Sequence, residues 1–154
     1  MSTRRPTVLL ADDHPQTAAM LRSLLEGPFD VIGCVTDGEA LVRAAERLSP
    51  DVIVSDIGMP RMDGIDAARR ILATNRDARV VFVTVQSNVS VVERSLAEGV
   101  LGYVVKMVAG DELVAAVHAA LRGQRHISGI VGFREDGADW RGGADGGSAR
   151  RDGD

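Results

Sequence analysis

The chain has 154 residues, a length that favours one domain with a single core. Its 45% hydrophobic and 26% charged residues are ordinary for a soluble globular protein, and a net charge of -4 gives no electrostatic reason to bind nucleic acid or an anionic membrane. The single cysteine, Cys34, excludes an internal disulfide, and no apolar run approaches the roughly 20 residues that cross a bilayer. We therefore expect a cytoplasmic protein without direct contacts to membrane or nucleic acid.

The first part of the chain alternates short apolar runs with segments of helical spacing. Residues 7–11 form the first run, and Pro15 then suits the first turn of a helix that ends at residues 26–28. Residues 31–35 form the second run, and a capping-box pattern at 36–39 opens the next helix. Continuous apolar runs of this length are typical of strands buried on both faces of a parallel sheet.

The same alternation continues along the chain. Residues 51–55 form a third run, and Asp63 is placed to cap the helix that follows. Residues 79–84 form a fourth run, and Ser87 or Ser90 is the expected cap of the fourth helix. The pattern therefore predicts strands and helices in strict alternation, as in an α/β protein.

A fifth run at residues 102–106 is followed by Leu113, Val117 and Leu121 at helical spacing. The count is (βα)5, and right-handed crossovers place helices on both faces of the sheet. We predict the α/β class, with a doubly wound parallel sheet of five strands in the flavodoxin-like order 2-1-3-4-5.

The composition changes after residue 123. Eight of the 17 glycines fall in residues 124–154, where apolar side chains are few. Such a segment cannot bury enough surface to offset the entropy of ordering it. We predict one folded domain over residues 1–123 and a Gly-rich, disordered C-terminal tail over residues 124–154.

Polar residues stand at the carboxyl ends of four of the five predicted strands. Asp12 and Asp13 follow the first strand and Asp56 follows the third, while Thr84 ends the fourth and Lys106 ends the fifth. In an open α/β sheet the ligand site lies beyond the carboxyl ends of the strands, at the point where the strand order reverses. We expect these side chains to converge there.

Three converging carboxylates repel one another and require cations. Mg²⁺ prefers oxygen ligands, and together with Lys106 it would balance three negative charges. A phosphoryl dianion could then enter a neutral site, where Thr84 offers a hydroxyl donor. A carboxylate is able to act as nucleophile and form an aspartyl phosphate. The pattern therefore indicates Mg²⁺-assisted phosphoryl transfer to an aspartate.

Four segments in this order and spacing, residues 8–15, 55–64, 83–84 and 102–106, resemble the receiver domain of response regulators, in the CheY-like superfamily. The Asp-Asp-His-Pro start and a lysine without a following proline are most similar to the NarL/FixJ branch. The resemblance covers residues 6 to about 123 and leaves no segment that looks like the helix-turn-helix output domain of that branch.

The resemblance implies roles for the acidic residues. Asp56 would be the phosphoacceptor, supplied by a sensor histidine kinase or a phosphotransfer protein, with acetyl phosphate as a substitute donor. Asp12, Asp13 and Asp56 would hold Mg²⁺, with the backbone carbonyl of Gly58 as a further ligand. The domain would assist only its own phosphorylation and dephosphorylation, so we do not expect an enzyme.

The resemblance also assigns Thr84 and Lys106 to phosphoryl binding. Tyr103 would be the aromatic side chain that swings inward when Thr84 moves, which would bias a partner-binding surface on the fourth helix, fifth strand and fifth helix. Val85 departs from the small residue usual after Thr84, and a branched side chain there is expected to narrow access to Asp56.

Other functions remain open at this point. An aspartate-nucleophile phosphatase would need an acid two residues after the nucleophile, where this chain has Gly58. A NarL/FixJ-type transcription factor whose DNA-binding domain is missing is a second option, which retention on duplex DNA at low salt would favour. A phosphorylation-independent interaction domain is a third. The alanines of the last helix raise the hypothesis of a homodimer, and the downstream protein target is unknown.

Overall fold

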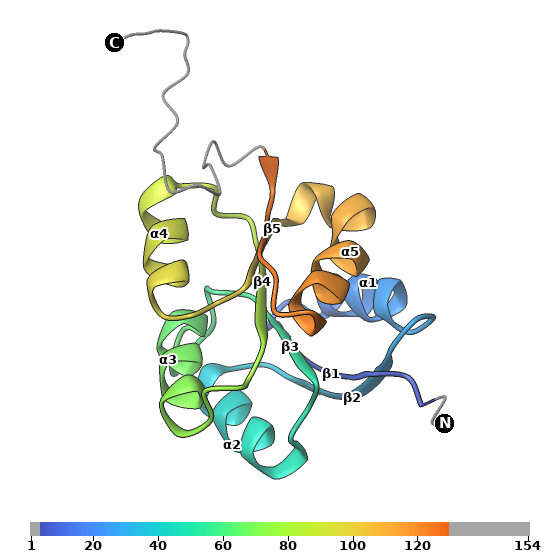
Figure 1. The fold of residues 1–154 in the computed structure, drawn as a ribbon, viewed down its shortest axis with the longest axis horizontal. Helices are drawn as coiled ribbons and strands as arrows, with labels where there is room; N and C mark the ends of the chain where they lie inside the picture. The colour runs from blue at the N-terminus through green and yellow to red at the C-terminus, as the bar shows by residue number, and fades with distance from the viewer. Residues whose placement is uncertain (1–3, 130–154) are drawn as a thin grey trace, which may run out of the picture.

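The computed structural model describes residues 4–129, which form a parallel sheet of six strands flanked by five α-helices (Figure 1). The sheet order is β2-β1-β3-β4-β5-β6, so the predicted order 2-1-3-4-5 is confirmed and one strand is added. In chain order the elements are β1 (Thr7–Ala11), α1 (Pro15–Leu25), β2 (Asp30–Val35), α2 (Gly38–Leu48), β3 (Val52–Ser55), α3 (Gly64–Thr74), β4 (Val80–Thr84), α4 (Val89–Ala97), β5 (Gly102–Val105), the 3-10 helix η1 (Lys106–Val108), α5 (Ala109–Leu121) and β6 (His126–Ile127).

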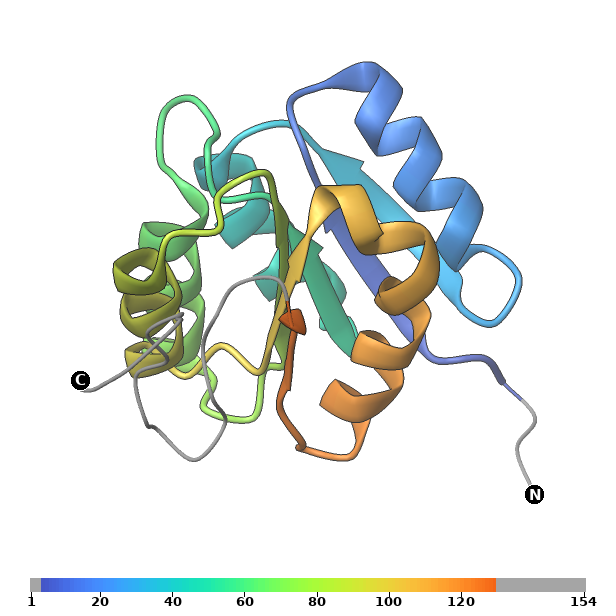
Figure 2. The same ribbon diagram turned by 90° about the horizontal axis from the view of Figure 1, so that it is seen from above.

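The helices cover both faces of the sheet, as a doubly wound fold requires. Helices α1 and α5 lie on one face, and α2, α3 and α4 lie on the other (Figure 2). Each face has its own apolar cluster, one built on Leu21 and Leu113 and the other on Leu41, Ile65 and Val92. The two clusters hold the sheet rigidly between two helical layers, so the strand ends are fixed in space.

Burial along the strands follows their place in the sheet. Every residue of β3 and β4 is buried, as the continuous apolar runs predict. Strand β2 is an edge strand with a mixed pattern, and Cys34 within it is exposed. The prediction of burial on both faces is therefore wrong for β2, because side chains at the edge of the sheet are only partly covered by the helices on either face.

The sixth strand is a correction to the sequence-based prediction. Residues 126–127 pair in parallel with β5, with His126 opposite Gly102 and Ile127 opposite Tyr103. They lie within residues 124–154, which were predicted to be a disordered tail, so that prediction is wrong for the paired strand. Residues 130–154 lie outside the described residues, and the division of the chain at residue 123 stays a prediction.

The helix caps were only partly predicted. Asp63 caps α3 as expected, accepting a hydrogen bond from the backbone N–H of Asp66. Helix α2 is capped by Asp37, the second residue of the predicted capping box. Helix α4 is capped by Asn88, which lies between the two serines that were considered. Each cap is a side-chain oxygen that satisfies an N–H group of the first turn.

None of the helices in the described part of the chain has the length and hydropathy of a membrane span.

Candidate functional site

The predicted acidic cluster forms where β1 and β3 end. The backbone N–H of Asp56 donates to the carbonyl of Ala11 at 2.9 Å, and the N–H of Asp12 donates to the carbonyl of Val35 at 3.0 Å. These bonds extend the strand pairing past the ends of the strands, so the first residue of each loop is held by the sheet. Asp12 and Asp56 are buried, with 1% and 5% exposure. The structure thus brings the acids together as expected.

Lys106 joins this cluster from the end of β5. Its Nζ lies 2.8 Å from Asp56 Oδ2, in a hydrogen bond, and 3.0 Å from Asp12 Oδ2, as an ion pair. Burial by itself lowers the pKa of Lys106, but the hydrogen bond with Asp56 and the negative charges of Asp56 and Asp12 outweigh it, so its pKa is raised. The lysine is therefore a fixed positive charge between two carboxylates.

The Lys106→Met substitution tests this bridge through the pH dependence of stability. A cation whose pKa is raised by folding contributes stability fully below its unfolded value of 10.5 and loses it as pH rises through the folded value. Urea unfolding should therefore show a stability difference between native protein and variant that is constant from about pH 7 to 9 and shrinks above about pH 10.5. The buried hydroxyl of Tyr103 titrates in both proteins and cancels in the difference. If the stability difference stays constant above about pH 10.5 as well, Lys106 is not held as a cation between Asp56 and Asp12.

The acids also offer a set of ligands suited to a metal ion. One ligand atom from each of Asp12, Asp13, His14 and Asp56 can be chosen so that all lie within 4.8 Å of one another. Two of the buried oxygens, Asp12 Oδ2 and Asp13 Oδ1, accept no hydrogen bond in the described structure. Each has only an ion-pair neighbour, Lys106 Nζ at 3.0 Å from Asp12 Oδ2 and His14 Nδ1 at 3.1 Å from Asp13 Oδ1. Buried carboxylate oxygens that accept no hydrogen bond are costly, and a hard cation such as Mg²⁺ satisfies such oxygens. The donor set therefore fits the expected ion.

His14 was not predicted as part of this cluster. Its Nδ1 lies 3.2 Å from Asp12 Oδ1 and 3.1 Å from Asp13 Oδ1, although its side chain is 63% exposed. Its backbone N–H also donates to Asp12 Oδ1 at 2.9 Å. The sequence places His14 directly after Asp12 and Asp13. This adjacency alone did not show that the imidazole ring contacts both carboxylates.

Thr84 and Tyr103 meet through a residue that the sequence did not single out, Gln86. Thr84 is buried and its Oγ1 accepts a hydrogen bond from the N–H of Gln86 at 3.3 Å. The Tyr103 hydroxyl donates to the carbonyl of Gln86 at 3.0 Å, and its ring packs edge-on against Phe82. Burial and the charge of Asp56 raise the pKa of Tyr103 to about 12. The ring that was expected to swing inward is already buried here.

The loop from β3 to α3 carries Asp56 and is tightly held. The N–H of Gly64 donates to the carbonyl of Ile57 at 2.7 Å, and a Cβ at Gly64 would overlap the carbonyl oxygen of Asp56. Arg61 has a left-handed φ of 66° and its Nη2 lies 3.1 Å from Asp37 Oδ2. Gly58 is exposed in this loop, and its carbonyl as a metal ligand stays a prediction.

Two large apolar side chains stand exposed beside the site. Val85, directly after Thr84, is 74% exposed, and Met107, directly after Lys106, is 82% exposed. The expectation that Val85 narrows access to Asp56 stays a prediction.

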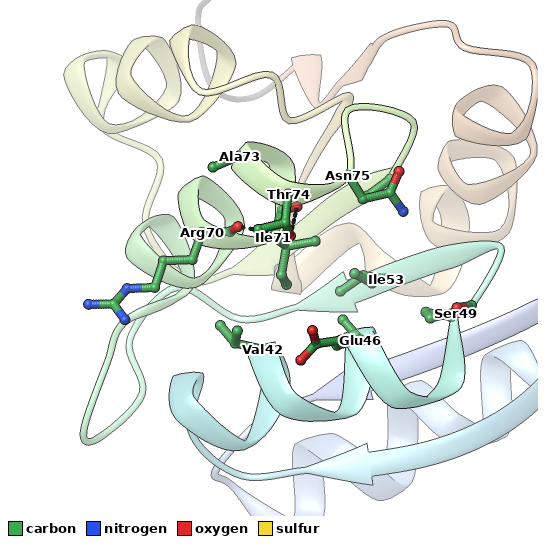
Figure 3. A pocket seen from close by; sticks show the side chains of 12 residues that line it. Val42, Glu46, Ser49, Ile53, Arg70, Ile71, Ala73, Thr74 and Asn75 are labelled. Carbon is green, nitrogen blue, oxygen red and sulfur yellow. Dashed lines mark hydrogen bonds between the residues drawn. The ribbon is translucent and has the colours of Figure 1, made fainter.

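A groove of about 720 Å³ lies between α2 and α3, with Val42, Ile53 and Ile71 in its lining (Figure 3). Its lining also includes Pro50 and Ala78, which precede β3 and β4, whereas the acidic cluster follows the strands. Because the strands are parallel, the groove lies at their amino ends, and the acidic cluster lies at their carboxyl ends. The groove is therefore separate from the acidic cluster.

Residues 8–118 match the family model of the response regulator receiver domain. Among curated proteins, the chain is 36% identical over 126 residues to the transcriptional regulatory protein PdtaR of Mycobacterium tuberculosis. It is 32% identical over 131 residues to the nitrate/nitrite response regulator protein NarL of Escherichia coli. These matches cover 81% and 83% of this chain but 61% of each relative. The chain thus spans about three fifths of the length of the curated relatives it matches.

Solved structures of response regulators share the fold. A two-component response regulator of the LuxR family from Aurantimonas superposes with a TM-score of 0.79 at 29% sequence identity. The superposition covers 82% of this chain and 92% of that one. The backbone fold therefore agrees with the sequence similarity.

Proposed function

The chain belongs to the response regulator receiver family, and from that premise we propose that it is a signalling phosphoacceptor. Asp56 takes a phosphoryl group from a sensor histidine kinase, or from a phosphotransfer protein, in a Mg²⁺-dependent reaction. The observation that carries this proposal is Lys106 Nζ held between Asp56 Oδ2 and Asp12 Oδ2, next to Asp13 Oδ1, a buried carboxylate oxygen that accepts no hydrogen bond.

The transfer makes one bond and breaks one. An oxygen of the Asp56 carboxylate attacks phosphorus, and the bond from phosphorus to the donor's imidazole nitrogen breaks, with the electron pair staying on nitrogen. Asp56 Oδ1 accepts from the N–H of Ile57 at 2.7 Å, which fixes the rotation of the carboxylate. The chain's task is then to hold the nucleophile in line with the leaving group and to neutralise charge.

Two side chains of this chain are placed to bind the transferred phosphoryl group. Lys106 Nζ already donates a hydrogen bond to Asp56 Oδ2, so it is placed to bind an oxygen of the new aspartyl phosphate. The Thr84 hydroxyl accepts from Gln86, which leaves its proton free to donate to a phosphoryl oxygen. Asp12, Asp13, Asp56 and the carbonyl of Gly58 would hold Mg²⁺, which when bound supplies charge neutralisation for the carboxylates and the phosphoryl group.

Switching follows from the shared partner of Thr84 and Tyr103. Both side chains bond to the backbone of Gln86, and α4 begins three residues later, at Val89. A movement of Thr84 toward a phosphoryl group would pull on the segment that anchors the Tyr103 hydroxyl. We infer that phosphorylation shifts the balance between two arrangements of the surface formed by α4, β5 and α5, which binds the downstream protein.

Of the two curated relatives, PdtaR is a transcriptional regulatory protein and NarL is a nitrate/nitrite response regulator. This chain spans 61% of each. The residues of the candidate site all belong to the receiver, so they support phosphoryl transfer and carry no proposal of DNA binding.

Intact mass spectrometry after incubation with acetyl phosphate and Mg²⁺ tests the proposal. We expect the native protein to gain one phosphoryl group, and EDTA to prevent the gain, because the carboxylates then face the incoming dianion without their cation. If no mass is gained with acetyl phosphate or with several other donors, phosphoacceptor function is refuted and the phosphorylation-independent interaction domain takes its place.

A further inference from the structure

Strand β6 brings a serine to the end of β5. The N–H of His126 donates to the carbonyl of Leu101 at 3.1 Å, and the N–H of Ser128 donates to the carbonyl of Tyr103 at 2.9 Å. The Ser128 hydroxyl then accepts from the N–H of Val105 at 3.1 Å. Val105 is the last residue of β5, so this side chain takes the place that a further strand residue would occupy in the ladder.

The Ser128 hydroxyl is oriented by a carboxylate on α5. Ser128 is fully buried, and its Oγ donates to Glu112 Oε1 at 2.9 Å. The same carboxylate oxygen lies 3.0 Å from His126 Nε2. Because the hydroxyl proton is directed to Glu112, a lone pair of the oxygen is left for the N–H of Val105. The three side chains form one polar unit over the edge of β5.

This unit acts on the backbone that carries Lys106. Val105 pairs with Thr84 of β4 on one side and is held by Ser128 on the other, so both sides of the strand end are fixed. Lys106 follows directly and reaches Asp56 and Asp12. Without Ser128 the N–H of Val105 would be a buried donor with no partner, and the strand end would shift to find one.

We propose that Ser128, oriented by Glu112, is a positioning residue that holds Lys106 in its contact with Asp56. The contribution to phosphoryl transfer rests on the proposed function, whereas the placement of Lys106 does not. The segment after α5 thus helps to position the side chains of the proposed phosphorylation site.

The test uses a property of the full chain: Lys106 is its only lysine. Protein made with ¹³C-labelled lysine gives one ε-methylene signal in NMR, and a side chain held between two carboxylates shows two distinct ε protons. We expect Ser128→Ala to make the two protons equivalent, as in a mobile lysine, and Ser128→Thr to restore the native signal. Glu112→Ala, which keeps the serine but removes its acceptor, should weaken the distinction in the same direction if Ser128→Ala fails to fold.

Ser95→Ala is the matched control. Ser95 is also fully buried, but its hydroxyl donates to the carbonyl of Val91 within α4 and not to any group of β5, β6 or α5. The same chemical change there should leave the Lys106 signal as in the native protein. An unchanged signal in both Ser128→Ala and Glu112→Ala, or an equal change in Ser95→Ala, would overturn the proposal.

Kinetics supply the second readout. Ser128→Ala should slow phosphoryl uptake from acetyl phosphate by about tenfold, less than the hundredfold that a 1 Å misplacement is able to cause. In a Lys106→Met background the same substitution should cause no further loss, because Ser128 acts through the lysine. An additional tenfold loss in that background would refute action through Lys106. If the native protein takes up no phosphoryl group, the NMR result alone decides the inference and only the proposed function fails.

Discussion

Asp56→Asn is expected to abolish phosphoryl uptake from acetyl phosphate. Asparagine has nearly the same shape and retains an oxygen that can accept from the N–H of Ile57, so the loop is expected to keep its fold. The amide, however, is neutral and lacks the anionic oxygen that attacks phosphorus. Intact mass spectrometry, with circular dichroism to confirm folding, should show no phosphorylated species at any donor concentration that fully converts the native protein.

Asp51→Asn is the matched control, because Asp51 precedes the same strand that Asp56 follows. Its Oδ2 accepts from the N–H of Thr7 at 2.8 Å at the opposite edge of the sheet. This variant is expected to take up phosphoryl as the native protein does, with a small loss of stability. If Asp56→Asn still takes up a phosphoryl group, the acceptor is instead Asp12 or Asp13.

Gly64→Ala is expected to be strongly destabilising. The added Cβ would overlap the carbonyl oxygen of Asp56 and lie 3.0 Å from the Cα of Ile57, so backbone has to move. Overpacking against a rigid backbone costs about 3 kcal/mol, at the upper end of such changes. Urea unfolding should show this loss, and phosphoryl uptake should slow because the displaced backbone carries Asp56.

Gly110→Ala provides the comparison for that change. Gly110 also lies in the first turn of a helix, α5, but a Cβ there has no atom within 4 Å. Alanine is the better helix former, so this variant should match the native protein or exceed it by up to about 1 kcal/mol. If both glycine variants lose the same stability, the contact of the added Cβ with the Asp56 carbonyl does not explain the loss at Gly64.

The fold could be predicted because its central strands are buried on both faces. Such strands are continuous apolar runs, and the predicted runs at residues 7–11, 51–55 and 79–84 agree with β1, β3 and β4 to within one residue. Once the order of parallel strands is known, the residues that leave them must meet at one edge. For this reason the meeting of Asp12, Asp13, Asp56 and Lys106 also followed from the sequence.

The features that were missed depend on conformation rather than on pattern. Strand β6 has two residues, too few to show any periodicity, and its stability comes from backbone bonds to β5 and from Glu112. Gln86 contributes only backbone groups to Thr84 and Tyr103, which no side-chain pattern reveals. The bend of His14 toward the acids and the left-handed φ of Arg61 are likewise decided by loop geometry.

An open sheet has two edges, and unpaired edges invite other chains to add a strand. Here the two edges are protected by different means. The register of β1 against β2 shifts between Val8 and Leu9, which breaks the regularity of the ladder at the β2 end. At the other end, β6 and the hydroxyl of Ser128 occupy the hydrogen-bonding groups of β5. The edge of the sheet next to Lys106 is thereby guarded against edge-to-edge aggregation by the short strand β6 and the side chain of Ser128.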